Sequence, residues 1–141
     1  MRLLAAREHS QAELRRKLCA RSYDGAAVDE VLDQLIQRHL QSDDRFTEQY
    51  ISSRQGRGFG PVRIRAELRE RGIDGGLIGD HLDGQDEQWV EYLRQAHDKK
   101  FGAVLPTDLT EKARRVRFLE YRGFTGSQIR GFFLQLEPCN L

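Results

Sequence analysis

The sequence has few cysteines and no long apolar run, and each absence narrows what the protein can be. Its 141 residues include two cysteines, Cys19 and Cys139, and neither belongs to a CxxC pair. A zinc site needs more ligands at short spacing, so we interpret both as ordinary thiols. No apolar run approaches the roughly 20 residues that cross a bilayer, and the N-terminal MRLLAAREHS lacks the apolar core of a secretory signal. We therefore expect a soluble, cytoplasmic protein without membrane contact.

Patterns that indicate catalysis are also missing. The four histidines are scattered, with no HExxH or HxH, and no nucleophile stands out beside a base. The stretch GRGFGPVRIR, residues 56–65, is rich in glycine, but a Walker loop continues with GK[ST] and here Pro61 and Val62 follow Gly60. Its glycine spacing also differs from the GxGxxG of dinucleotide folds. We predict no enzyme, cofactor or metal, and a nucleotide enzyme is the weakest alternative.

What the sequence does have is segregated charge. Charged residues make up 32% of the chain, although the net charge is only +1. Residues 54–71 carry six arginines and two glutamates, whereas residues 74–91 carry six acids and neither lysine nor arginine. A segment of one sign can bind a charged partner even when the average charge of the protein is close to zero.

Three short strings, RSYDG (21–25), RGIDG (71–75) and RGFTG (122–126), repeat at a spacing of about 50 residues, which is typical of repeat architectures. Each predicts the end of one helix and the start of the next. Glycine at the second position, present in the last two strings, takes the left-handed conformation that closes a helix. The third residue is expected to fold back on a leucine five positions earlier (Tyr23 on Leu18, Ile73 on Leu68, Phe124 on Leu119), and the fourth to cap the following helix.

Helix start signals agree with this repeat. Capping boxes at Ser10-x-x-Glu13 and Thr125-x-x-Gln128, Asp108-x-x-Glu111, and proline after Gly60 each predict a helix N-terminus. Further helices are expected over 43–55 and 86–100, whereas the first copy has only MRLLAAR and its leading helix looks clipped. The predicted fold is all-α, with three tandem three-helix, helix-turn-helix-like repeats over 1–40, 41–84 and 85–141. They are expected to form an elongated, curved array in which each repeat contacts mainly its neighbours.

The second helix of each repeat is basic, and its cations alternate with core positions. We expect these side chains on an exposed face that binds a large negative partner. Together with cations of the neighbouring segments, the candidate residues are Arg15, Arg16, Lys17, Arg54, Arg57, Arg63, Arg65, Arg69, Arg71, Lys99, Lys100, Arg114, Arg115, Arg117 and Arg122. A DNA-reading helix-turn-helix is disfavoured, because the helix that would enter the groove carries acids, among them Asp29 and Asp80. Phe59 and Trp89 are further candidates for exposed contacts.

Two stretches resemble the RecX family. The first runs from Asp44-Arg45-Phe46 through Gly58-x-Gly60-Pro61 to Gly72-Ile73, and the second from Lys100-Phe101-Gly102 to Arg122-Gly123-Phe124. The resemblance covers nearly the whole chain. It implies a non-catalytic regulator of the RecA recombinase that binds in the groove of the RecA–single-stranded DNA filament. It further implies inhibition of ATP hydrolysis, strand exchange and LexA cleavage, by blocked filament growth or by disassembly.

The partners expected from this resemblance are the RecA filament and, weakly and without sequence preference, single- and double-stranded DNA. We expect the protein to be a monomer. A DNA-binding helical module that acts independently of RecA is the alternative.

Overall fold

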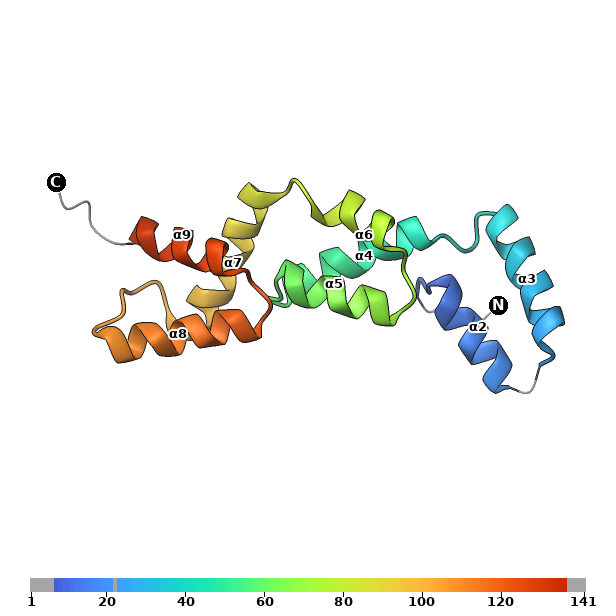
Figure 1. Ribbon diagram of the computed structural model, residues 1–141, viewed down its shortest axis with the longest axis horizontal. Coiled ribbons are helices and arrows are strands. Elements are labelled where there is room, and N and C mark those ends of the chain that lie inside the picture. Colours follow the sequence, from blue (N-terminus) through green and yellow to red (C-terminus); the bar gives the residue numbers. More distant parts are fainter. Residues whose placement is uncertain (1–6, 22, 137–141) are drawn as a thin grey trace. The chain divides into compact units, whose positions relative to one another are not determined.

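The computed structural model describes residues 7–21 and 23–136, and the part of the chain that it describes contains helices and no strands (Figure 1). The helices are α2 (Gln11–Ala20), α3 (Gly25–Gln37), α4 (Asp43–Gly56), α5 (Pro61–Glu70), α6 (Gly75–Leu82), α7 (Asp86–Phe101), α8 (Leu109–Tyr121) and α9 (Gly126–Leu136). The all-α prediction is confirmed. The expected helices over 43–55 and 86–100 are α4 and α7, each one residue longer at its C-terminus. The clipped leading helix and Cys139 lie outside the described residues.

The chain divides into two compact units. The first holds the residues up to Ile51 together with Glu67–His81, and the second holds Ser52–Ala66 together with the residues from Leu82 onward. The division therefore passes through α4, α5 and α6. The expected repeat boundaries after residues 40 and 84 stay a prediction.

In the first unit, α2 packs against α3 through an apolar seam. The buried side chains are Leu14, Leu18, Val28, Leu32 and Leu35. They recur three or four positions apart, so each helix presents one apolar face to the other. The capping box that begins α2 is present, because the Glu13 amide donates to Ser10 Oγ and the Ser10 amide donates to Glu13 Oε1.

In the second unit, α7, α8 and α9 pack against one another. Their shared core includes Trp89, Leu93, Leu119, Ile129 and Phe132. The prediction that Trp89 is an exposed contact is wrong, since its side chain is 1% exposed. Trp89 and Leu93, four positions apart, lie on the apolar face of α7, and burial of the large indole stabilises the unit.

The last two predicted helix closures are confirmed. Gly72 and Gly123 have φ of 79° and 98°, and the amides of Ile73 and Phe124 donate to the carbonyl oxygens of Leu68 and Leu119. Both apolar residues are buried. At the first closure the prediction for Tyr23 is wrong, because its side chain is 59% exposed. That string has serine in place of the closing glycine at its second position, and Ser22 lies outside the described residues.

Side chains cap the later helices as expected. The amides of Gly76 and Leu77 donate to Asp74 Oδ2, and the amide of Glu111 donates to Asp108 Oδ1. Thr125 and Gln128 form a reciprocal capping box at the start of α9. Asp24 is the exception, since it precedes α3 but makes no side-chain cap.

Candidate binding surface

Three arginines of the second unit converge on one aromatic ring, that of Phe59. The guanidinium carbons of Arg54, Arg63 and Arg122 lie 3.9, 4.4 and 4.9 Å from the ring centroid. Arg54 comes from α4, Arg63 from α5, and Arg122 from the end of α8. Cation–π attraction orients such side chains without removing their charge. Phe59 therefore holds three positive groups together that are far apart in the sequence.

Close backbone contact between the start of α5 and the turn after α8 creates this arrangement. The Gly60 amide donates to the Arg122 carbonyl oxygen at 2.8 Å, and the Val62 amide donates to the Gly123 carbonyl oxygen at 2.9 Å. A Cβ on Gly60 would lie 2.5 Å from backbone atoms of Gly123 and Phe124. Glycine is therefore required at this approach, and amides that have no partner within helix α5 are satisfied by the turn.

Beside this contact lies an open pocket of about 320 Å³ within the second unit. Four cations line it, Arg57, Lys99, Lys100 and Arg122, and none of the described lining residues is an acid. Arg122 is well anchored: its Nη1 donates to the Arg57 carbonyl oxygen, and its guanidinium also faces the ring of Phe118. The pocket therefore presents positive charge from three segments of the chain.

The predicted cations of α5 and of the turn after it do not form a free basic face. Arg63 packs on Phe59, and Arg65 pairs with Asp83 at 2.8 Å. Arg71 faces the ring of Tyr50 and donates to the Glu67 carbonyl oxygen. Arg69 is exposed. An exposed ion pair such as that of Arg65 contributes little to stability, and its arginine can change partner at low cost.

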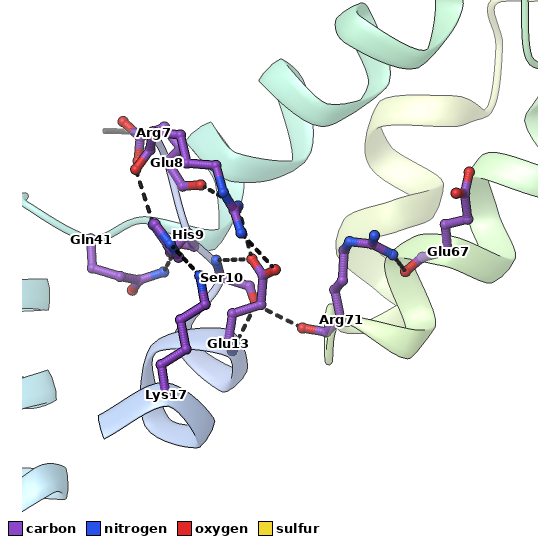
Figure 2. Close-up of polar contacts among 9 residues, drawn as sticks. All are labelled: Arg7, Glu8, His9, Ser10, Glu13, Lys17, Gln41, Glu67 and Arg71. Carbon is purple, nitrogen blue, oxygen red and sulfur yellow. Dashed lines mark hydrogen bonds and ion pairs between the residues drawn. The ribbon is translucent and has the colours of Figure 1, made fainter. Parts of the chain in front are cut away.

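On α2, Arg16 is exposed, whereas its two basic neighbours have partners. Arg15 pairs with Asp29, and Lys17 Nζ lies 3.0 Å from His9 Nε2. Figure 2 shows Lys17 reaching from α2 to this ring, whose Nδ1 lies 3.0 Å from the Arg7 carbonyl oxygen. A neutral His9 with its proton on Nδ1 satisfies both contacts. Burial, with the positive charges of Arg7 and Lys17, lowers the pKa of His9 from its ordinary value.

The same contact group fastens the start of α2 to the turn after α5. In Figure 2, Ser10 Oγ donates to the Arg71 carbonyl oxygen at 2.8 Å. Burial raises the pKa of Glu13, but the hydrogen bond from the Ser10 amide and the charge of Arg7 outweigh it, so its net pKa is lowered. The ionised Glu13 thereby holds the cap in place.

On α8, the expected exposure of Arg115 is wrong. Its side chain is 5% exposed, and it donates to the Val104 carbonyl oxygen at 2.6 Å and to Glu111 at 3.2 Å. Its Nη1 also lies 3.2 Å from the buried His97 Nε2. Arg115 therefore joins α8 to α7 and to the loop between them. Arg114 pairs with Glu111 on the surface, and Arg117 is exposed.

Three models of the RecX family match the chain. The model of the first three-helix domain matches residues 1–35, that of the second matches 42–82, and that of the third matches 86–133. The chain belongs to the RecX family.

Individual RecX relatives agree with this assignment. The regulatory protein RecX of Halorhodospira halophila is 42% identical over 130 residues, which cover 92% of this chain and 81% of that protein. That of Pseudomonas savastanoi is 43% identical over 124 residues, covering 88% and 80%. The crystal structure of RecX from Lactobacillus salivarius superposes with a TM-score of 0.80 at 21% identity, covering 96% of this chain and 90% of that one. The structural likeness supports the fold.

Within this RecX chain, the second unit brings together Arg54, Arg57, Arg63, Lys99, Lys100 and Arg122. Arg15, Arg16, Lys17, Arg69 and Arg71 belong to the first unit, and a single strip along three basic helices stays a prediction. Sequence reasoning missed Gln55 and Tyr92, which line the pocket. Nothing in the periodicity of α4 or α7 distinguishes these two from ordinary polar positions.

The described residues also bear on metal and membrane binding. They contain no group of three or more histidine, cysteine or acidic side chains arranged to hold a metal ion. None of the helices they form is long and apolar enough to span a bilayer.

Proposed function

We propose that this RecX-family protein regulates the RecA recombinase without catalysing a reaction itself. It binds as a monomer in the groove of the RecA–single-stranded DNA filament in the cytoplasm. There it inhibits ATP hydrolysis, strand exchange and LexA cleavage, either by blocking filament growth or by promoting disassembly.

The observation that carries this proposal is the gathering of cations in the second unit. Arg54, Arg63 and Arg122 surround Phe59, and Arg57, Lys99 and Lys100 line the adjacent pocket with Arg122. A cluster of this kind attracts a phosphate backbone or an acidic protein surface. A filament of protein on single-stranded DNA offers both, and membership of the RecX family favours RecA as the protein.

The test is the RecA ATPase on single-stranded DNA, measured together with filament length by electron microscopy. We expect saturating protein to lower the hydrolysis rate and shorten the filaments. An unchanged rate with unchanged filament length would refute the proposal. If filaments formed before the protein is added become shorter, the protein promotes disassembly. If only filaments that are still growing are affected, it blocks the addition of RecA at the filament end.

A second candidate is a DNA-binding module that acts without RecA, and the pocket without acidic lining favours it. DNA affinity measured against salt concentration distinguishes the two. Tight binding with a clear sequence preference supports an independent module. Weak binding that falls steeply with salt supports phosphate contacts that assist RecA regulation.

A further inference from the structure

The pocket of the second unit contains a buried donor that has no partner. Gln55, in the last turn of α4, is 8% exposed and lines the pocket. Its Nε2 is shielded from solvent and makes no hydrogen bond. A buried amide left unpaired costs free energy, and such groups are rare unless a ligand supplies the missing acceptor.

The other lining residues indicate that this acceptor is an anion. Arg57, Lys99, Lys100 and Arg122 are positive, and none of the described lining residues is negative. Arg122 contacts the rings of Phe59 and Phe118 and donates to the Arg57 carbonyl oxygen, so the plane that contains its N–H donors is fixed in advance. A fixed guanidinium suits two oxygens of one oxyanion, and lysines add charge beside it.

The number of cations favours a ligand with more than one negative charge over a single carboxylate. One carboxylate would leave three of the four positive groups uncompensated, whereas a nucleotide strand brings one negative charge with every residue. The pocket volume of about 320 Å³ is near the lower end of small-ligand sites, which suits a fragment of a strand. Tyr92, which also lines the pocket, offers a half-buried aromatic side chain to a neighbouring base.

We propose that this pocket binds the phosphate group of a nucleotide, free or within a single strand, and that Gln55 donates to a phosphate oxygen. The last torsion of a glutamine side chain is broad, so a small rotation of the amide presents Nε2 to the pocket. This inference rests on the nucleic-acid contact in the proposed function. It is tested without RecA, so that failure of the pocket and failure of RecA regulation are told apart.

The experiment measures binding of a fluorescein-labelled 12-residue oligothymidylate to the full chain by anisotropy. We expect Gln55→Leu to weaken binding by about tenfold, the effect of one hydrogen bond to a charged group. Lys99→Glu should also weaken binding, and the fall of log K with log salt should become shallower by about 0.7. Arg130→Glu, the same charge change at an exposed residue of α9, is the matched control and should keep the wild-type slope. Wild-type affinity in both pocket variants would overturn the proposal.

Two further measurements identify the ligand and the role of Gln55. Competition by thymidine monophosphate or inorganic phosphate identifies a free phosphate, and competition by unlabelled strand alone identifies a phosphodiester; both results support the site. Displacement by oligoglutamate as effective as by unlabelled strand would overturn phosphate in favour of an acidic peptide. The melting temperature of Gln55→Leu should equal or exceed that of wild type, because an unpaired buried amide is removed. A fall would assign Gln55 a structural role and overturn its assignment as a donor.

Discussion

Arg115 shows how the partners of one side chain decide its role. It lies on the basic helix α8 between Arg114 and Arg117, but four positions before the buried Leu119 and therefore on the same face of the helix. Its guanidinium is buried between Glu111, the Val104 carbonyl oxygen and His97. A buried cation that satisfies several acceptors belongs to the structure of the unit and not to its binding surface.

Replacing Arg115 by methionine should therefore reduce stability. Methionine keeps most of the aliphatic part of the side chain, so the loss comes mainly from acceptors left unpaired and is expected to be about 2–3 kcal/mol. Chemical denaturation with a helical signal measures it. Arg117→Met, at an exposed site in the same helix, should stay within about 0.5 kcal/mol of wild type. Equal effects of the two variants would contradict the structural role of Arg115.

His9 makes the first unit sensitive to acid. Its folded pKa is lowered, mainly by burial, so below the ordinary value of 6.5 the unfolded chain binds more protons than the folded one. Stability from this group is therefore present above pH 6.5 and is lost as the pH falls through the folded pKa. Protonation would also place a positive ring against Lys17 Nζ.

We expect His9→Gln to reduce the loss of stability between pH 7 and pH 5. Denaturation curves at several pH values, for wild type and variant, measure the difference. Glu13 faces the same group, but its lowered pKa acts below its ordinary value of 4.5, outside this range. A variant whose stability falls with pH as steeply as that of wild type would exclude His9 as the source.

At the scale of the helix, the same junction occurs once in each unit. The start of one basic helix contacts the glycine-containing turn that follows the basic helix of the next repeat. In the first unit Ser10 contacts the Arg71 carbonyl oxygen, and a Cβ on Gly72 would lie 2.5 Å from Ala12 Cβ. In the second unit Gly60 contacts the Arg122 carbonyl oxygen. Gly72 and Gly123 thus each close one helix and also contact the N-terminal turn of another helix.

Gly60→Ala should disrupt the second junction. The added methyl group meets backbone atoms at 2.5 Å, which cannot move as a flexible side chain does, so we expect a loss of about 2–3 kcal/mol. Gly56→Ala is the matched control, because nothing lies within 4 Å of its added Cβ. Thermal unfolding compares the two, and equal melting temperatures would show that the junction tolerates a side chain.

At the scale of the whole molecule, the proposed regulation depends on which unit carries the binding charge. The second unit gathers six of the candidate cations around Phe59 and the pocket. In the first unit Arg15 and Arg71 have partners on the same unit, whereas Arg16 and Arg69 are exposed. Clustered charges give a stronger local potential than scattered ones. We therefore expect the second unit to dominate binding.

Paired charge reversals test this expectation. Arg57→Glu with Lys99→Glu, both exposed in the second unit, should raise the concentration needed for half-inhibition of the RecA ATPase by about tenfold or more. Arg16→Glu with Arg69→Glu makes the same charge change in the first unit and should have a much smaller effect. A larger effect from Arg16→Glu with Arg69→Glu would assign the main contact to the first unit. Helicity of both variants, by circular dichroism, controls for folding.

The sequence alone determined where most helices begin and end. Caps at Ser10, Asp108 and Thr125 and closures at Gly72 and Gly123 are local, because each is made by hydrogen bonds within about five residues. The Gly60-Pro61 start is local only in its proline, since the Gly60 and Val62 amides donate to the distant Arg122 and Gly123. Gly60-Pro61, Gly72 and Gly123 also belong to the stretches that resemble the RecX family. Of the three closures only the first failed, at Tyr23, where the string has serine and not glycine at its second position.

Only the tertiary structure decided which cations are available to a partner. Helical periodicity predicts a polar face, but it does not reveal whether a distant element supplies acceptors to that face. Arg115 is buried by its contacts with α7 and the loop before α8, and Arg122 is anchored by Phe59 from the start of another helix. Gln55 gained its place in a positive pocket in the same way. These roles depend on which helices meet, and that choice comes from burial of apolar surface across the whole unit.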